Sequence, residues 1–228
     1  MKNCYYINSI DPDKDKFLLA LKNYFEKIAT KNILLAVPLK SNLDGVIKEV
    51  FGEGFVKTLL KGNTVTASGF KFSLMTCRTG PQFSFQGAVL ALYATKDLLD
   101  KIDNLRGVTD VLLIPWIKDD LSEWVPRWQA IDIETEQRAA GIQLSPEVKE
   151  KIDNLHAVVN VSTGLSHPSD RDYAIKLFKK MKEERISFNP GEIRNYLISE
   201  KKWNSTNADH VFEIADGIIK GKRFRTRS

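Results

Sequence analysis

Residues 87–94, with the sequence Gly87-Ala-Val-Leu-Ala-Leu-Tyr-Ala94, form an almost entirely apolar run bounded by turn residues. A second apolar run, Val108–Ile114, is closed by Pro115-Trp116. Each run is too short to span a bilayer, and short runs without polar alternation are typical of parallel strands that are covered on both faces. We therefore predict two neighbouring parallel strands in an α/β core.

The segment between these two runs has the pattern of an amphipathic helix. Thr95 is a candidate N-cap, and we expect Gly107 to end the helix. Apolar residues recur between them at helical spacing, at Leu98, Leu99, Ile102 and Leu105. The resulting strand–helix–strand unit predicts a right-handed crossover and directs attention to one edge of the sheet as the place for a ligand.

The flanking sequence extends the α/β pattern over residues 1–134. We expect a helix over 14–30, a strand over 33–39, and a helix that Ser41 caps and that Gly52 or Gly54 ends. Alternating residues around Ser68-Gly69 predict a hairpin over 64–76, and a helix over 119–130 precedes a short strand over 131–133. These elements predict a mixed, mostly parallel sheet flanked by helices.

The last third of the chain has a different organisation. Residues 135–144 are polar and indicate a linker or an exposed helix, and residues 145–228 indicate a smaller, mainly helical segment with a basic tail. Helix start signals occur at Ser145-Pro146, Ser169, Asn189-Pro190 and Thr206. The sequence Lys101–Leu105 recurs as Lys151–Leu155, which we interpret as two similar helix-to-strand junctions, with an ancient duplication as the alternative.

The composition excludes several classes of protein. Hydrophobic residues make up 43% and charged residues 28% of the chain, which is typical of a globular protein. No apolar run approaches the roughly 20 residues of a membrane span, and the N-terminus lacks a signal-peptide pattern. Cys4 and Cys77 supply no disulfide framework and no zinc-like spacing with the histidines. We expect a cytoplasmic protein without a metal or a cofactor.

The positive charge lies mostly in the C-terminal segment. From Ile142 onward the chain has 16 of its 34 Lys and Arg residues but 12 of its 29 Asp and Glu residues. This excess predicts contact with nucleic acid or another acidic partner, and an aromatic residue between the basic ones suits stacking on a base. A solubilising terminus is the alternative. The candidate contact residues are Arg194, Lys201, Lys202, Lys220, Lys222, Arg223, Phe224, Arg225 and Arg227.

A second candidate site lies where the predicted parallel strands end. Helices that begin at Ser41 and Thr95 direct free N–H groups toward this edge, which suits a phosphate or carboxylate, and Trp116 can stack on a ring. Neither G-x-G-x-x-G nor G-x-x-x-x-G-K-[ST] occurs in the chain. The candidate residues of this ligand edge are Lys40, Ser41, Arg78, Thr95, Lys96, Trp116 and Lys118.

No catalytic motif accompanies either site. The loop that contains His167, Ser169 and Asp170 has groups suited to acid–base chemistry, but a helix start explains it equally well, so no catalytic residue is assigned. We therefore expect a non-enzymatic binding or adaptor protein that uses its basic C-terminal segment. The alternative is a nucleotide- or phosphometabolite-binding enzyme or regulator that uses the strand edge, and a third hypothesis makes Trp124 and Trp128 an oligomer interface.

Overall fold

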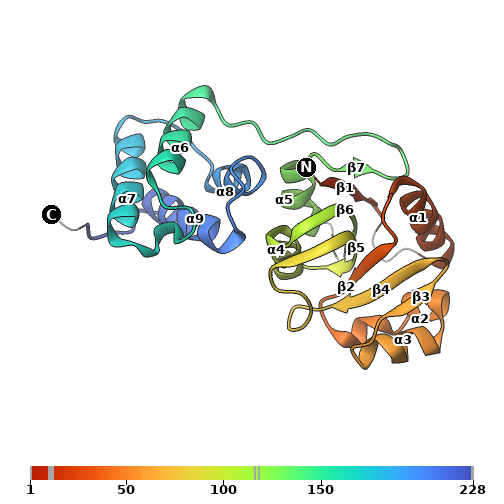
Figure 1. Cartoon of the computed structure of the whole chain (residues 1–228). Helices are drawn as coiled ribbons and strands as arrows, with labels where there is room; N and C mark the ends of the chain where they lie inside the picture. The colour runs from red at the N-terminus through yellow and green to blue at the C-terminus, as the bar shows by residue number, and fades with distance from the viewer. Residues whose placement is uncertain (1, 10–12, 116, 118, 227–228) are drawn as a thin grey trace. The chain divides into compact units, whose positions relative to one another are not determined.

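The computed structural model describes residues 2–9, 13–115, 117 and 119–226. These residues form two compact units, Met1–Ala140 and Gly141–Ser228, and each is described by itself (Figure 1). The first unit contains the sheet, and the second contains helices.

The sheet has seven strands and is mostly parallel. Its strands follow the order β3-β4-β2-β5-β6-β1-β7, and each neighbouring pair is parallel except β3 and β4. The predicted mixed, mostly parallel sheet flanked by helices is thus confirmed. The strands are β1 (Asn3–Tyr6), β2 (Asn32–Ala36), β3 (Val65–Ala67), β4 (Phe70–Met75), β5 (Ser84–Ala94), β6 (Arg106–Pro115) and β7 (Ile131–Asp132).

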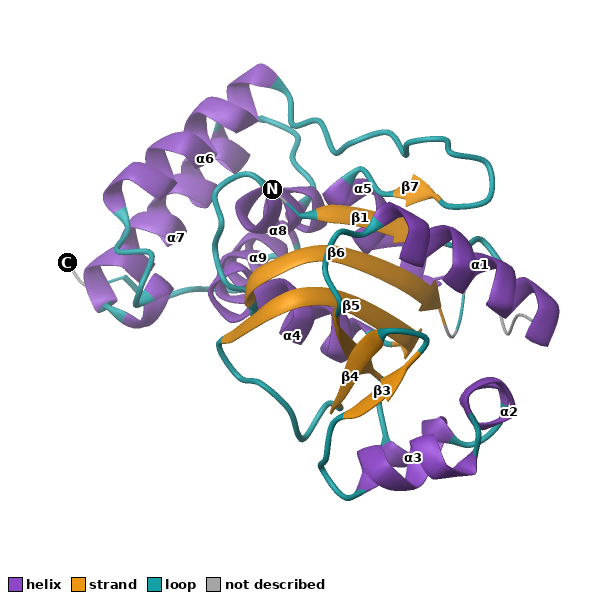
Figure 2. Cartoon of the chain, turned by 45° about the vertical axis from the view of Figure 1, so that its right-hand side comes forward, coloured by secondary structure: helices purple, strands orange, loops and turns teal. Residues whose placement is uncertain are grey.

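Helices cover both faces of this sheet (Figure 2). On β2, Ile33 and Leu35 pack on one face with α1 (Lys14–Lys27), α2 (Val46–Phe51) and α3 (Glu53–Leu60). The alternate residues Leu34 and Ala36 pack on the opposite face with α4 (Lys96–Asn104) and α5 (Asp119–Trp128). Because side chains alternate along a strand, only an apolar run without polar alternation can fill both cores.

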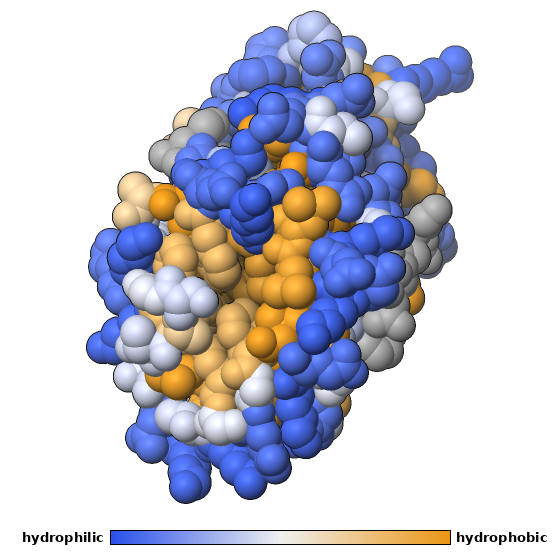
Figure 3. Space-filling model, turned by 90° about the vertical axis from the view of Figure 1, so that its right-hand side faces the viewer, coloured by the Kyte–Doolittle hydropathy of each residue, from blue (hydrophilic) through white to orange (hydrophobic). Residues whose placement is uncertain are grey.

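The first face carries an aromatic cluster that is open in part to solvent. Phe25 stacks on Phe70 with ring centroids 4.4 Å apart, and Phe51 stacks on Phe55 at 4.5 Å. Phe25 and Phe51 are half-buried. Figure 3 shows apolar residues gathered on this side of the molecule.

The strand–helix–strand unit predicted around residue 100 forms as β5–α4–β6, but its helix ends before Gly107. Leu105 already has an extended backbone, and Gly107 lies in β6 with a φ of +84°. The pairing of β5 with β6 shifts register here, and a Cβ on Gly107 would lie 2.4 Å from Gln86 Nε2. The glycine therefore serves a β-bulge and a close side-chain approach instead of a helix end.

The helix expected after Ser41 is also corrected. Residues Lys40–Leu43 form a 3₁₀ turn, η1, and α2 begins only at Val46 after Gly45, whose φ is +83°. The side chain of Asn42 accepts a hydrogen bond from the Leu39 N–H, so the polar group that stabilises this turn is Asn42. In contrast, the predicted hairpin at Ser68-Gly69 forms as β3–β4, with positive φ at both turn residues.

Residues 135–144 form no helix. The chain turns back along β7, where the Asp132 N–H donates to the Gln137 carbonyl and the Ala139 N–H donates to the Ala130 carbonyl. Gln137 and Ala139 therefore hydrogen-bond to the end of the α/β unit, and the exposed helix considered as one alternative is wrong.

The second unit contains four α-helices in its described residues. They are α6 (Pro146–Val158), α7 (Pro168–Glu183), α8 (Pro190–Ser199) and α9 (Ser205–Ile219), with a 3₁₀ turn, η2 (Gly164–Ser166), before α7. Ser145 and Asn189 cap α6 and α8 as expected. The caps of α7 and α9 both lie two residues earlier than expected, at His167 and Asn204, because Pro168 and Ser205 already have helical conformations.

The repeated five-residue sequence does not mark a structural repeat. Residues 101–105 lie at the end of α4, and β6 follows them directly. Residues 151–155 lie inside α6, which continues to Val158, and no strand of the described chain follows it. The expectation of two equivalent helix-to-strand junctions is therefore wrong, since the second copy remains helical.

Candidate functional site

Five residues of the predicted ligand edge, Lys40, Ser41, Arg78, Thr95 and Lys96, follow the carboxyl ends of three adjacent parallel strands. Ala36 at the end of β2 pairs with Met75 of β4 on one side and with Ala91 of β5 on the other, so the loops that follow lie next to one another. After β2 the chain crosses one face of the sheet, and after β5 it crosses the opposite face. Adjacent strands whose connections diverge in this way define the point where open α/β sheets bind ligands.

Three exposed cations follow these strands: Lys40 after β2, Arg78 after β4 and Lys96 after β5. The Cys77 N–H donates to the Pro38 carbonyl at 3.2 Å, which ties the Arg78 loop to the loop after β2. Thr76 Oγ1 accepts hydrogen bonds from the Arg78 and Thr79 N–H groups at 3.1 and 3.0 Å. We name Lys40, Ser41, Arg78, Thr95 and Lys96 the switch-point edge.

The two hydroxyl residues of this edge differ in role. Thr95 precedes α4, and its side chain makes no capping hydrogen bond. Ser41 lies within η1, so it does not direct the N-terminus of an α-helix toward the edge as expected. The backbone just before Thr95 also departs from regular strand geometry. Tyr93 has a φ of +52°, and the pairing of β5 with β6 shifts register between Leu92 and Ala94. Trp116 and Lys118, the other two predicted residues, lie outside the described part of the chain.

A different part of the same sheet edge contains a pocket that the sequence did not reveal. It lies between the end of β1 and α5 and has a volume of about 290 Å³. Its lining residues are Tyr6, Asn8, Leu121, Ser122, Val125 and Pro126. They come from segments more than 100 residues apart, and no local pattern joins them.

In the C-terminal unit, several predicted contact residues are occupied by intramolecular partners. Arg194 is 1% exposed, and its Nε lies 2.5 Å from Asp209 Oδ1, so the expectation that it contacts phosphates is corrected. Lys201 pairs with Asp153 at 2.9 Å and Lys220 pairs with Asp216 at 2.8 Å. Lys202 Nζ donates to the Ser199 carbonyl. Lys222, Arg223 and Arg225 are exposed, and Arg227 lies outside the described residues.

Phe224 packs within the molecule and not on a free tail. A Cβ placed on Gly217 of α9 would lie 2.6 Å from the edge of the Phe224 ring, so the ring occupies the space that a side chain would need. The Arg171 guanidinium lies 5.8 Å from the ring centroid, and Lys179 Nζ donates to the Phe224 carbonyl at 3.3 Å. The expected stacking of Phe224 on a base is therefore corrected, because the ring anchors the tail to α7 and α9.

This anchoring brings basic residues of the tail next to basic residues of α7. α7 contributes Arg171 and Lys179, which contact Phe224, and the tail contributes the exposed Lys222, Arg223 and Arg225. We name these five residues the α7–tail surface. On α9, the carboxylates of Asp209 and Asp216 are both held in ion pairs.

A buried carboxylate joins several elements of the α/β unit. Asp103 of α4 is fully buried and accepts from Lys2 Nζ at 2.6 Å and from Arg127 at 2.8 Å. The indole N–H groups of Trp124 and Trp128 donate to it at 3.3 and 3.1 Å. Burial opposes ionisation, but the Lys2 and Arg127 charges outweigh it and hold the pKa of Asp103 below its usual value.

This network corrects the hypothesis that Trp124 and Trp128 supply an oligomer interface. Trp124 is 1% exposed, and Lys2 Nζ covers the Trp128 ring at 4.0 Å from its centroid. The Trp124 ring therefore belongs to the interior of the unit, and the half-buried Trp128 ring packs against the same core. The indole N–H groups make the hydrogen bonds that buried Trp residues require.

A comparable but more exposed cluster lies between α6 and α8. Asp153 accepts from Lys149 at 2.6 Å, from the Tyr196 hydroxyl at 2.6 Å and from Lys201 at 2.9 Å. Partial desolvation opposes ionisation, but these hydrogen bonds lower the pKa of Asp153 well below its usual range. The cluster joins α6, α8 and the following turn, which explains it without a ligand.

The remaining candidates for catalysis have structural roles. His167 Nδ1 lies 2.7 Å from Ser169 Oγ, and both residues are exposed at the start of α7. Burial raises the pKa of Cys4 to about 12, which favours the neutral thiol at neutral pH. Among the described residues, no group of three His, Cys, Asp or Glu side chains is placed to hold a metal ion.

Comparison with known proteins finds a match only for the C-terminal unit. Residues 144–228 are similar to a family described as a domain of unknown function (DUF1889). No curated protein and no solved structure matches the chain. None of the helices in the described part of the chain has the length and apolar composition that crossing a membrane requires.

Proposed function

We propose that the protein is a non-enzymatic binding protein whose α7–tail surface contacts nucleic acid. The supporting observation is the seat of Phe224 on Gly217, which holds three exposed cations of the tail beside Arg171 and Lys179 of α7. Cations that are already ordered bind a phosphate backbone with a smaller loss of conformational entropy than those of a free tail. Cys4 is a buried free thiol and Cys77 is a half-buried one, which fits the cytoplasmic location that we propose with this function.

The first test is the salt dependence of binding. We expect the full chain to bind mixed-sequence duplex DNA or single-stranded RNA, with an affinity that falls steeply between roughly 50 and 200 mM salt. In the variant Lys222→Ala/Arg223→Ala/Arg225→Ala, the slope of log K against log salt on duplex should fall by about 0.9 for each phosphate that is no longer neutralised. Fluorescence anisotropy of a labelled oligonucleotide measures both quantities.

The matched control is the variant Lys48→Ala/Lys61→Ala/Lys71→Ala, which also removes three positive charges, but from the α/β unit. All three of these lysines are exposed, as the three tail residues are. The control should keep the slope of the wild type. An unchanged slope in the tail variant, or no binding at low salt, would reject the proposal. Binding to polyglutamate in place of nucleic acid would assign the surface to an acidic protein partner instead.

Phe224→Ala separates anchoring from charge. The variant keeps every cation of the tail but removes the ring that holds it on α9. We expect weaker binding with an unchanged salt slope, since the number of neutralised phosphates stays the same while more of the tail must be ordered on binding. A wild-type affinity for Phe224→Ala would show that the docked tail is not the binding form.

The switch-point edge supports a second candidate function, binding of a nucleotide or phosphorylated metabolite. The observation that favours it is the placement of Lys40, Arg78 and Lys96 after three in-register strands. We expect ADP or pyrophosphate, but not sulfate at equal ionic strength, to raise the melting temperature of the α/β unit. A ligand at 100 times its dissociation constant stabilises a protein by about 2.7 kcal/mol, which calorimetry detects readily.

The variant Lys40→Ala/Lys96→Ala should abolish this thermal shift. Lys57→Ala/Lys61→Ala is the control, since it removes two exposed charges from α3 and its end on the same unit. If neither ADP nor pyrophosphate shifts the transition, or if the two variants respond alike, this second function is rejected.

A further inference from the structure

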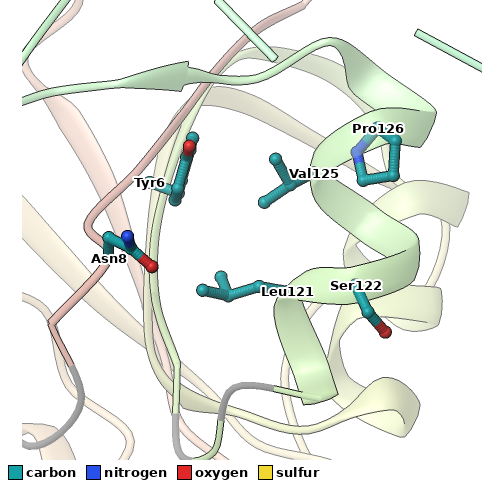
Figure 4. Close-up of a pocket in the computed structure, with 6 residues that line it drawn as sticks. All are labelled: Tyr6, Asn8, Leu121, Ser122, Val125 and Pro126. Atoms are coloured by element: carbon teal, nitrogen blue, oxygen red, sulfur yellow. The ribbon is translucent and has the colours of Figure 1, made fainter. Parts of the chain in front are cut away.

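The pocket beside β1 has two walls of different chemistry (Figure 4). One wall is the last residue of β1, Tyr6, which pairs with Leu113 of β6 on one side and Asp132 of β7 on the other. The Ile133 N–H donates to the Tyr6 carbonyl at 2.9 Å, and the Ile7 N–H donates to the Leu113 carbonyl at 3.2 Å. The backbone that carries the ring is therefore held from both sides.

The opposite wall is a single helix. Leu121 and Val125 lie one turn apart on α5, and Ser122 and Pro126 form the next row. Figure 4 shows the Tyr6 ring edge-on, with its face turned toward Leu121 and Val125 across the pocket. Leu121 and Val125 are each only 8% exposed, so the half-buried Tyr6 ring supplies the aromatic surface on which a flat ring can stack.

The size and polarity of the pocket restrict the ligand further. Its volume of about 290 Å³ lies near the lower end of the range for ligand pockets, roughly 300–1,000 Å³, so it suits one ring system. None of the described lining residues is charged. Burial, followed by the charge of Asp132, raises the pKa of Tyr6, so its phenol stays neutral at physiological pH.

One polar side chain on the Tyr6 wall can read the edge of such a ring. Asn8 follows β1 by two residues, is exposed, and lines the same pocket. A carboxamide offers a donor and an acceptor side by side, which matches a ring edge that presents an acceptor next to a donor. We propose that this pocket binds a neutral, flat heteroaromatic ring of nucleobase size, stacked on Tyr6 and hydrogen-bonded at its edge by Asn8.

This site is distinct from the switch-point edge, because β6 lies between β5, the last strand of that edge, and β1. The inference does not depend on either proposed function. It would hold for a free ring compound and for one base of a nucleic acid, since both present the same flat edge.

The experiment uses the full chain with labelled methyl and amide groups and three probes: adenine, uracil and nicotinamide. We expect at least one probe to shift the NMR signals of the Val125 methyls and the Asn8 side-chain amide in a saturable way. Asn8→Ala should weaken that probe about five- to tenfold, as expected for the loss of one neutral hydrogen bond. Tyr6→Leu should weaken it by about tenfold through the loss of the aromatic face.

The matched control is Asn63→Ala, which removes an exposed asparagine from a turn of the same unit and should leave binding unchanged. Toluene tests the role of the polar edge, because it is flat but offers no hydrogen bond. If toluene binds as tightly as the three probes and Asn8→Ala has no effect, edge recognition is overturned. If none of the three probes shifts the pocket signals, the site itself is overturned.

Discussion

Replacing Asp103 by alanine should destabilise the α/β unit by about 3–5 kcal/mol, the range found when one partner of a buried ion pair is removed. The variant leaves the Lys2 ammonium, 9% exposed, and the Arg127 guanidinium, 2% exposed, without their shared carboxylate. It also removes the acceptor of the Trp124 and Trp128 indoles. Arg127 keeps weaker pairs with Asp100 at 3.5 Å and Glu123 at 3.6 Å, so we expect the lower half of that range.

Urea unfolding followed by tryptophan fluorescence measures this loss directly. Asp97→Asn on the first turn of the same helix is the control, since Asp97 is exposed and its substitution should change stability by less than about 1 kcal/mol. A free energy of unfolding for Asp103→Ala that lies close to the wild-type value would contradict the assignment of Asp103 as the centre of this network.

The same carboxylate predicts the acid sensitivity of the unit. Because the folded pKa of Asp103 is lowered, its ionised form contributes stability that is fully present above the unfolded pKa, about 3.9 for Asp. That contribution is lost as the pH falls through the folded pKa. We expect the stability of the wild type to decline in this acid range and Asp103→Asn to decline less steeply, because it has no charge to lose there.

The second large effect is expected for Gly87→Ala, which should destabilise the sheet by roughly 2–5 kcal/mol. Gly87 has a φ of +153°, and a Cβ there would lie 2.4 Å from the backbone carbonyl oxygen of Asn32 on β2. A backbone oxygen cannot rotate away as a flexible side chain can. Relief of the clash therefore requires β2 and β5 to separate at the centre of the sheet.

Gly69→Ala is the control for the conformational part of this effect. Gly69 has a φ of +78° in the β3–β4 turn, and no atom lies within 4 Å of a Cβ placed there. The Gly69→Ala variant should therefore lose only about 1–2 kcal/mol of stability, which is the cost of placing a non-glycine residue in this backbone conformation. Equal midpoints in urea for the two variants would show that Gly87 is required for its φ alone and not for the close approach of β2.

The candidate sites were predictable only where they follow from strand order. Lys40, Arg78 and Lys96 were identified because the carboxyl ends of parallel strands share an edge, and in the structure they follow three adjacent, in-register strands. Tyr6 and Val125 of the pocket were not identified, because 119 positions separate them and neither belongs to a motif. Their proximity depends on β1 pairing beside β6, which local sequence does not encode.

The α7–tail surface illustrates the same division within one segment. Composition located the positive charge in the C-terminal part but could not show that Arg194 is buried against Asp209 or that Phe224 fills the space over Gly217. Charge counts treat all cations alike, whereas burial and ion pairing decide which of them a phosphate can reach. The structure therefore replaces Arg194 with Arg171 and Lys179 as candidate contacts.

The α/β unit around β5–α4–β6 could be predicted from the chain alone, because apolar runs and helical periodicity are local properties. The same holds for the hairpin at Ser68-Gly69 and the caps at Ser145 and Asn189, whose signals span a few residues. The folded chain was needed to show that Asp103 gathers Lys2, Arg127 and two indoles, and that Gly87 must lack a side chain. These roles depend on atoms brought together from distant positions, since burial and close approach are set by packing and not by neighbours in sequence.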